Sequence, residues 1–366
     1  MQEDTKRPRA REIGLTPGTL APGQLNSITD VSGVKIGQET VILGDEVRTG
    51  VTAIVPHGGN ILQEKVPAAI FVGNGFGKLV GSTQVNELGN IETPIMLTNT
   101  LCVGRVADAL VDYMLSIFGN EQVSTVNPVV GETNDGYLNN IRSKQVGRDQ
   151  VFRALQNAST GPVEEGCVGA GTGTRALGFK AGIGTSSRTV EVRGLGEFTV
   201  GVIVQSNFGG SLTISGVPVG RELAVGEVRA SSLAGDTHEK DGGSVMVVIA
   251  TDAPLEYRNL HRLAVRSFLG LARTGFVSEN QSGDYFIAFS TAEEARIQQS
   301  KTHPRLIDEV RNDEMNPLFL GAIEATEEAV YNSLFRATTM KGWNNHVMKA
   351  LPVEETMQVL EKHKAI

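Results

Sequence analysis

The 366-residue sequence has few cysteines and no long hydrophobic run, and each shortage excludes a class of protein. Two cysteines, Cys102 and Cys167, are too few for a disulfide scaffold, and their small or apolar neighbours indicate buried free thiols. No stretch approaches the ~18 apolar residues of a membrane span, and no apolar segment of the kind found in signal peptides follows Met1. We therefore expect a soluble, cytoplasmic protein with no membrane partner.

Clusters of basic and of metal-binding residues are also scarce. The formal net charge is −8, and only residues 6–11 are rich in lysine and arginine, which is typical of a solvated tail. Because phosphate binding needs concentrated positive charge, we expect no nucleic-acid partner. The six histidines form neither an HExxH motif nor a paired spacing, so we expect no metal. The glycine-rich segments 73–77 and 169–173 lack the spacing of a dinucleotide-binding loop or a P-loop, and we expect no cofactor.

Glycine, by contrast, is abundant, with 43 residues against an average of roughly 7%. This predicts many tight turns and close backbone approaches. Strand-like runs (34–36, 41–43, 51–55, 68–72) precede a helical pattern over residues 100–119. Residues 189–205 are typical of a β-hairpin, and residues 244–250 of a strand buried on both faces. A helix capped by Asp252 should end at Gly275; a strand over 284–290 and a helix from Asn316 follow.

Strands come in runs and helices in blocks, without strict alternation. This order favours layered α+β architecture, with antiparallel or mixed sheets, over a doubly wound parallel sheet. No linker and no internal repeat divides the chain, so we expect a single domain.

The dipeptide Gly243-Ser244, between a turn and the buried strand, offers a specific chemistry, although such a sequence is usually only a turn. The Ser244 hydroxyl can attack the carbonyl of Gly243, and hydrolysis of the resulting ester would expose Ser244 as a new amino terminus. Its freed α-amine, with a reference pKa of roughly 7.7–8.0, can then act as base for its own hydroxyl. One residue would thus supply nucleophile and base, which suits a sequence without a GxSxG motif.

Several motifs resemble the DmpA family of aminopeptidases, which comprises L-aminopeptidase/D-amidase-esterases and β-peptidyl aminopeptidases. They are LNSITDV (25–31), GETNDG (131–136), VGAGTGT (168–174), GIGTSSR (182–188), Gly243-Ser244 before VIATDAP (248–254), and SGD (282–284). The resemblance implies an αββα four-layer sandwich like that of N-terminal-nucleophile hydrolases, with the connectivity of DmpA and the ornithine acetyltransferases.

The resemblance also implies a single catalytic domain, residues 1–366, that cuts itself into an α segment (1–243) and a β segment (244–366). It implies no cofactor, substrates that are small peptides or amides with a free amino terminus, and a homo-oligomer of αβ protomers, a tetramer or larger. Ser244 matches the nucleophile. Ser282 and Asp284 match a pair that orients and polarises it; being two apart on a strand, they should share a face. Some relatives have Glu in place of Asp284.

Three further residues match positions of the family. Asn207 matches an oxyanion-stabilising amide, Tyr137 a tyrosine that hydrogen-bonds to the intermediate, and Glu132 a carboxylate that pairs with the substrate ammonium. Each also has a structural alternative, a turn cap for Asn207 and loop packing for the other two.

The resemblance implies a hydrolase that removes L-α-, D-α- or β-amino acyl residues from peptides, amides and esters through an acyl-enzyme. Two alternatives stay open. One is an acyltransferase of the ornithine acetyltransferase superfamily, in which threonine normally occupies the nucleophile position. The other is a non-enzymatic binding protein that retains the fold.

Overall fold

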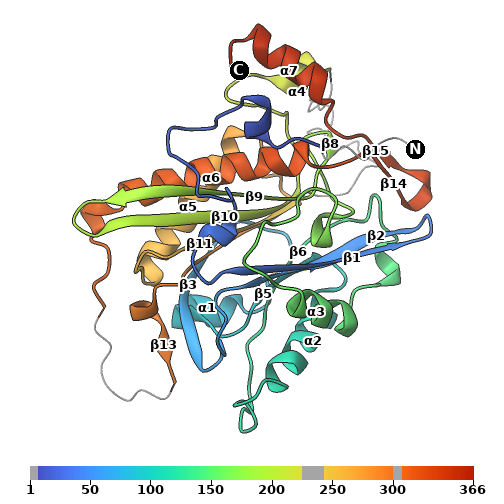
Figure 1. Ribbon diagram of the computed structural model, residues 1–366. Helices are drawn as coiled ribbons and strands as arrows, with labels where there is room; N and C mark the ends of the chain where they lie inside the picture. The colour runs from blue at the N-terminus through green and yellow to red at the C-terminus, as the bar shows by residue number, and fades with distance from the viewer. Residues whose placement is uncertain (1–6, 225–242, 300–306) are drawn as a thin grey trace.

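The apolar run predicted as a buried strand forms β11 (Ser244–Thr251), and all of its residues are buried. Its side chains alternate between two cores: Val245 and Val247 pack beneath helices, whereas Met246 and Val248 pack against a second sheet. A strand covered on both faces can be apolar throughout. The computed structural model describes residues 7–224, 243–299 and 307–366, and within them β11 lies near the middle of the molecule (Figure 1).

Two sheets pack face to face. The seven-stranded sheet has the order β13-β3-β12-β11-β10-β9, and β4 also pairs with β3. Its other strands are β3 (Glu64–Gly75), β4 (Asn90–Ile91), β9 (Ile183–Val192), β10 (Gly196–Asn207), β12 (Gly283–Ser290) and β13 (Ile297–Gln298). The four-stranded sheet has the order β1-β2-β5-β6, from β1 (Lys35–Leu43), β2 (Val47–Val55), β5 (Ile95–Asn99) and β6 (Val129–Thr133).

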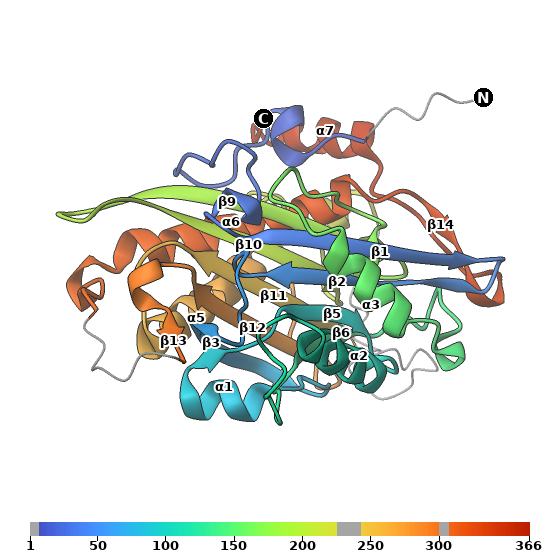
Figure 2. The same cartoon turned by 60° about the horizontal axis from the view of Figure 1, so that its bottom comes forward.

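Helices cover the outer face of each sheet, which makes four layers in the order αββα (Figures 1 and 2). On the larger sheet, α6 (Asn316–Phe335) contacts β9 and β10, and α5 (Tyr257–Arg273) contacts β3 and β12. On the smaller sheet lie α2 (Val103–Leu115) and α3 (Arg148–Gln156). The remaining α-helices and strands are α1 (Ser82–Leu88), α4 (Val219–Glu222), α7 (Val353–Lys362), β7 (Arg175–Ala176), β8 (Phe179–Lys180), β14 (Met340–Lys341) and β15 (Val347–Met348).

The expected helices, hairpin and buried strand are present, but the expectations for Asp252 and Cys167 are wrong. Asp252 does not cap α5, which has Glu256 at its N-cap; instead the Asp252 carboxylate accepts a 2.7 Å hydrogen bond from the backbone N–H of Thr199 on β10. Of the two free thiols, Cys102 is buried, whereas Cys167 is only half-buried. Both errors arise because contacts distant in sequence decide the local environment.

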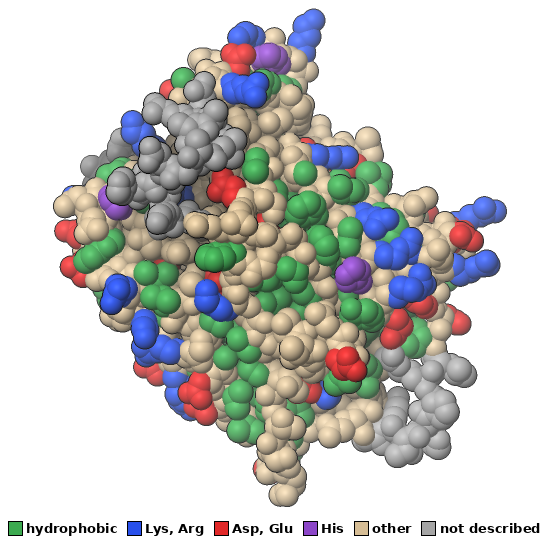
Figure 3. All heavy atoms as spheres, turned by 180° about the vertical axis from the view of Figure 1, so that it is seen from behind, with side chains coloured by type: hydrophobic (Ala, Val, Ile, Leu, Met, Phe, Trp, Pro, Cys, Tyr) green, Lys and Arg blue, Asp and Glu red, His purple; other side chains and the backbone are tan. Residues whose placement is uncertain are grey.

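Hydrophobic side chains also reach the surface. Figure 3 shows them over the middle of the face opposite to that of Figure 1, with charged side chains mostly towards its margin. Over the whole described surface, the most exposed of the large ones are Phe118 (93%), Phe76 (65%) and Leu88 (61%). Among the described helices, none is long and apolar enough to cross a membrane.

Candidate active site

Ser244 stands at the beginning of β11, where three strands of the larger sheet meet. It lies opposite Asn207, the last residue of β10, and opposite Gly283, the first residue of β12. Side-chain alternation places Ser244 on the same face as Met246, towards the space between the two sheets. Only 4% of the surface of Ser244 is exposed. The strand order therefore brings together residues that are far apart in the sequence.

Two N–H groups donate to the Ser244 hydroxyl oxygen. The backbone N–H of Asn134, just beyond β6, lies 3.2 Å from Oγ, and the Asn207 side-chain Nδ2 lies 3.5 Å from it. Asn207 Oδ1 in turn accepts the backbone N–H of Arg175 at 3.2 Å, which directs Nδ2 towards Ser244. Two donors that converge on one oxygen can stabilise negative charge there. The sequence does not single out Asn134, because a backbone N–H has no signature in the residue type.

The peptide before Ser244 is tightly enclosed by backbone. The backbone N–H of Gly283 donates to the carbonyl oxygen of Gly243 at 3.3 Å, which polarises that carbonyl group. A Cβ on Gly243 would lie 3.1 Å from Phe208 Cα and 3.3 Å from Gly209 N. Glycine therefore suits this position because neighbouring backbone approaches closely.

Asp284 is buried, and its carboxylate accepts hydrogen bonds from two hydroxyl groups. Ser282 Oγ donates to Oδ1 and Ser278 Oγ to Oδ2, each at 2.5 Å. Burial raises the pKa of Asp284 above its usual value, and the two hydroxyls oppose that rise only in part. Ser282 precedes β12 and the register against β3 shifts after Asp284, so the pair meets at an irregular strand end. In the described ranges, no hydrogen bond joins either residue to Ser244.

Glu132 lies on β6 with only 3% of its surface exposed. Its Oε2 accepts the Thr100 hydroxyl, and its Oε1 accepts the backbone N–H of Lys78 at 3.1 Å. The Lys78 ammonium is 3.9 Å from the same oxygen. Burial raises the pKa of Glu132, and the contacts with Thr100 and Lys78 oppose that rise.

The ring of Tyr137 lies between two other side chains. It stacks on His346, with ring centroids 4.4 Å apart, and the Arg175 guanidinium lies 3.9 Å from its centre. Because the Arg175 backbone also holds Asn207, Tyr137 adjoins the site through Arg175. The described structure contains no hydrogen bond between its hydroxyl and Ser244, so a role in the reaction stays a prediction.

A further carboxyl group, Asp135, follows directly after Asn134 and was not singled out from the sequence. It accepts the Thr49 hydroxyl at 2.5 Å and the Asn139 side-chain amide at 2.8 Å. Burial raises its pKa to about 7. Through Thr49, on β2, this carboxyl anchors the chain that presents the Asn134 N–H to Ser244.

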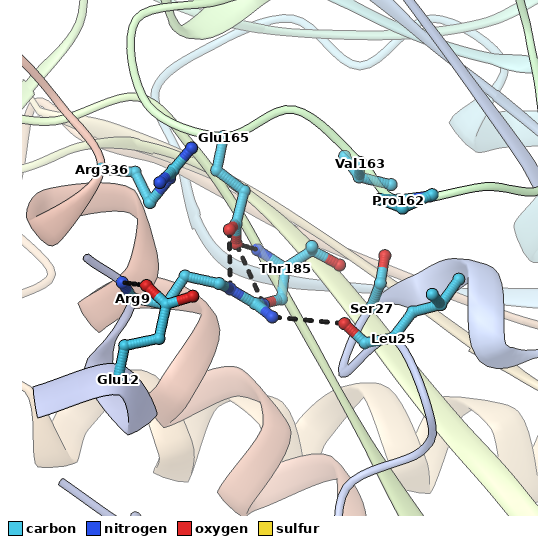
Figure 4. A pocket seen from close by; sticks show the side chains of 9 residues that line it. All are labelled: Arg9, Glu12, Leu25, Ser27, Pro162, Val163, Glu165, Thr185 and Arg336. Carbon is cyan, nitrogen blue, oxygen red and sulfur yellow. Dashed lines mark hydrogen bonds and ion pairs between the residues drawn. The ribbon is translucent and has the colours of Figure 1, made fainter. Parts of the chain in front are cut away.

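A separate small cavity of ≈ 90 Å³ lies where the N-terminal arm, residues 7–23, meets β9 (Figure 4). Arg9 crosses it, 2.8 Å from Glu165, and donates to the carbonyl oxygens of Leu25 and Thr185. Arg11 pairs with Glu328 at 2.9 Å. The expectation of a solvated basic tail is therefore wrong for these arginines, which hold the arm to the sandwich.

No group of three or more histidine, cysteine, aspartate or glutamate residues suited to a metal ion occurs in the described part of the chain.

Comparison with known proteins shows similarity over nearly the whole chain. The profile of peptidase family S58 matches residues 26–348. Beta-peptidyl aminopeptidase BapA of Sphingosinicella microcystinivorans is 40% identical over 375 residues, which covers 98% of this chain and 93% of that protein. A solved structure from Pyrococcus horikoshii OT3 is 47% identical, with a TM-score of 0.89 over 97% of this chain and 99% of the other.

The L-aminopeptidase D-Ala-esterase/amidase of Ochrobactrum anthropi is 37% identical, with a TM-score of 0.88 over 98% of this chain and 99% of that one. It is described as a prototype for the serine aminopeptidases and as a new variant among the Ntn hydrolase fold. The expected fold, an α+β sandwich of the N-terminal-nucleophile-hydrolase type, is thereby confirmed.

Proposed function

Because this chain belongs to peptidase family S58 and is a hydrolase of the aminopeptidase type, we propose that it removes amino-terminal residues from small peptides, amides and esters through an acyl-enzyme on Ser244. The observation that carries this proposal is the convergence of the Asn134 and Asn207 donors on the Ser244 hydroxyl oxygen. The relatives reported above with a named activity are aminopeptidases, and they lend no support to the acyltransferase alternative.

The enzyme first cuts itself. Ser244 Oγ attacks the carbonyl carbon of Gly243, the bond from that carbon to the Ser244 nitrogen breaks, and an ester links the two residues. Water then hydrolyses the ester, which leaves a carboxylate on Gly243 and a free α-amine on Ser244. The hydrogen bond from Gly283 N–H to the Gly243 carbonyl oxygen favours the attack, because it stabilises the charge that develops on that oxygen.

In turnover, the α-amine of Ser244 takes the proton of its own hydroxyl as Oγ attacks the substrate carbonyl. The proton then passes to the departing amine, and water hydrolyses the acyl-enzyme. Asn134 N–H and Asn207 Nδ2, which contact Oγ before the attack, stabilise the oxyanion that forms on the adjacent substrate carbonyl oxygen. The Ser282 hydroxyl donates a hydrogen bond to Asp284, which leaves the lone pairs of its oxygen free to accept a hydrogen bond from the Ser244 amine and orient it.

Glu132 binds the ammonium of the substrate. A buried carboxylate with a raised pKa is stabilised when a cation pairs with it, so a free amino terminus binds well here. An N-acetylated substrate would leave Glu132 without that partner, a loss of about 2–5 kcal/mol in comparable charge pairs. Tyr137, whose ring packs against Arg175, is the candidate donor of a further hydrogen bond to the intermediate.

A denaturing gel, N-terminal sequencing and kinetics on alanyl and β-alanyl anilides test this proposal. We expect segments of residues 1–243 and 244–366, the second beginning Ser-Val-Met-Val, and little turnover of the N-acetylated anilides. Ser244→Ala should stay uncut and inactive, whereas Ser159→Ala, at an exposed serine, should behave as the wild type. Cutting at the same bond in Ser244→Ala would contradict the mechanism.

The cleaved protomers associate into a homo-oligomer, a tetramer or larger. The hydrophobic side chains on the face shown in Figure 3 support this, because apolar patches at a surface mark sites of protein association. Light scattering coupled to gel filtration measures the mass, and a monomer at micromolar concentration would contradict it.

A further inference from the structure

Lys78 contacts the Glu132 carboxylate through both its backbone and its side chain. The backbone N–H of Lys78 donates to Glu132 Oε1, and the Lys78 ammonium lies 3.9 Å from the same oxygen. The backbone N–H and the side-chain ammonium of Lys78 thus both lie at the same carboxylate oxygen. The Lys78 side chain is 55% exposed and that of Glu132 only 4%. A buried anion and a half-exposed cation therefore lie beside each other at this place.

The segment that carries Lys78 is held in place by close packing. A Cβ on Gly77 would lie 2.9 Å from Tyr285 Oη and 3.0 Å from Glu132 Oε1. The backbone at Gly77 must therefore rest against both side chains. Burial, together with the nearby Glu132 and Asp284, raises the pKa of Tyr285 to about 12, so its phenol stays neutral. Lys78 is then the cation that faces Glu132.

This charge pair lies close to the nucleophile. Glu132 is two residues before Asn134, whose N–H contacts Ser244 Oγ. At a rise of about 3.3 Å per strand residue, two residues span roughly 7 Å. That spacing suits an aminoacyl group whose carbonyl reaches Ser244 while its charged end reaches Glu132.

A simple aminoacyl substrate would place a second cation beside the Lys78 ammonium, and the two like charges would repel each other. A residue that carries a carboxylate beside its ammonium satisfies both partners. We propose that the site takes amino-terminal β-aspartyl residues, with the ammonium on Glu132 and the neighbouring carboxylate on Lys78. In β-aspartyl amides these two groups share one carbon, and the scissile carbonyl lies at the other end.

This inference rests on the proposed aminopeptidase activity. Ser244 would attack the β-carbonyl, the C–N bond to the leaving amine would break, and water would release aspartate from the acyl-enzyme. In α-aspartyl amides the ammonium and the carboxylate lie on different carbons, so that class fits the adjacent charges less well. We expect α-aspartyl anilide to be the poorer substrate.

The test compares kcat/KM for β-aspartyl 4-nitroanilide and 3-aminobutanoyl 4-nitroanilide, in which a methyl group replaces the carboxylate. In the processed wild type we expect the β-aspartyl compound to be preferred. Lys78→Met should lower the ratio of the two values on the order of tenfold, the loss of one charge-assisted hydrogen bond. Lys78→Arg should retain the preference. Lys362→Met, which removes a similarly exposed lysine from its pair with Glu222, is the matched control.

Equal rates on the two substrates in the wild type, or an unchanged ratio in Lys78→Met, would overturn the inference and leave the aminopeptidase activity in place. Hydrolysis of neither compound, nor of any free aminoacyl anilide, would instead overturn the proposed function. A second readout does not depend on turnover: in calorimetry, L-aspartate should bind the processed wild type more tightly than β-alanine does. The reverse order of affinities would contradict the assignment.

Discussion

Three carboxyl groups around Ser244 are buried, and burial raises the pKa of each above its usual value: Asp284, Glu132 and Asp135. Each is held by hydroxyl, amide or backbone N–H donors that stabilise its charged form. Such groups are useful in a site that binds cations, because a substrate ammonium gains most from a carboxylate that lacks water. Burial of an ionised carboxylate costs free energy in the folded state, so the free energy of unfolding should depend on pH.

Asp135 gives the clearest pH dependence. Its pKa is raised to about 7 in the folded protein, whereas in the unfolded chain it keeps its usual value. Between these values the folded state binds more protons, so rising pH lowers the free energy of unfolding through this window, by at most about 4 kcal/mol. Asp135→Asn should flatten the dependence between pH 4 and about 7, because an amide does not titrate.

Urea unfolding from pH 5 to pH 8 measures this effect as the difference between wild type and Asp135→Asn. Asp45→Asn is the control, since that aspartate is exposed and should leave the pH profile unaltered. Parallel profiles for wild type and Asp135→Asn would show that Asp135 is ionised at low pH in the folded protein.

The sequence indicated side-chain candidates of the site and missed the contacts made by backbone. Ser244 and the pair Ser282 and Asp284 lie within recognisable motifs, and Asn207 has a residue type that suits an oxyanion donor. The Asn134 N–H and the placement of Lys78 depend on how β6 and the end of β3 pack against β12, which local patterns do not report. Tyr137 has the right type, but its stacking on His346 depends on a segment 209 positions away in the sequence.

Whole elements were easier to predict than their boundaries. The periodicity of residues 100–119 predicted a helix, and α2 occupies residues 103–115 of that range. The runs at 34–36 and 41–43 are parts of one strand, β1, because pairing with β2 continues through the polar residues between them. The helix after β11 begins at Tyr257, after the expected cap, since Asp252 is engaged by β10. Tertiary pairing therefore decided where each element ends.

The packing of α5 on α6 depends on one glycine, which a matched pair of substitutions can test. A Cβ on Gly270 in α5 would lie 2.2 Å from the Ile323 carbonyl oxygen on α6. Gly104 in α2 has no atom within 4 Å of such a Cβ. Alanine is the better helix former by roughly 0.5–1 kcal/mol, so Gly104→Ala should stabilise the protein by up to that amount. Gly270→Ala should destabilise it by about 1–3 kcal/mol, because the helices must move apart.

The midpoint of urea unfolding distinguishes the two outcomes for the glycine pair. Midpoints that rise together in both variants would show that α5 and α6 are not in such close contact.

At the scale of the whole molecule, strands from both sides of Gly243 are interleaved in one sheet. β11 and β12, from the proposed segment 244–366, lie between β3 and β10 of segment 1–243. The β10–β11 pairing runs from Val200↔Thr251 to Asn207↔Ser244, and α6 covers β9 and β10 of the other segment. Cleavage before Ser244 would break one peptide bond and remove no strand from its neighbours.

The two segments should therefore stay together after cleavage and unfold in one transition, because neither can keep its share of the sheet alone. Refolding should differ between the forms. In the uncut Ser244→Ala chain, β10 and β11 are joined and refolding is unimolecular, whereas the cut segments must first find each other. We expect the yield of refolded wild type to rise with protein concentration at low concentrations, and that of Ser244→Ala to be independent of it. Far-ultraviolet circular dichroism after dilution from urea measures both yields. Segments that separate on gel filtration in native buffer, or identical concentration dependence in the two forms, would contradict an interleaved sheet as the link between them.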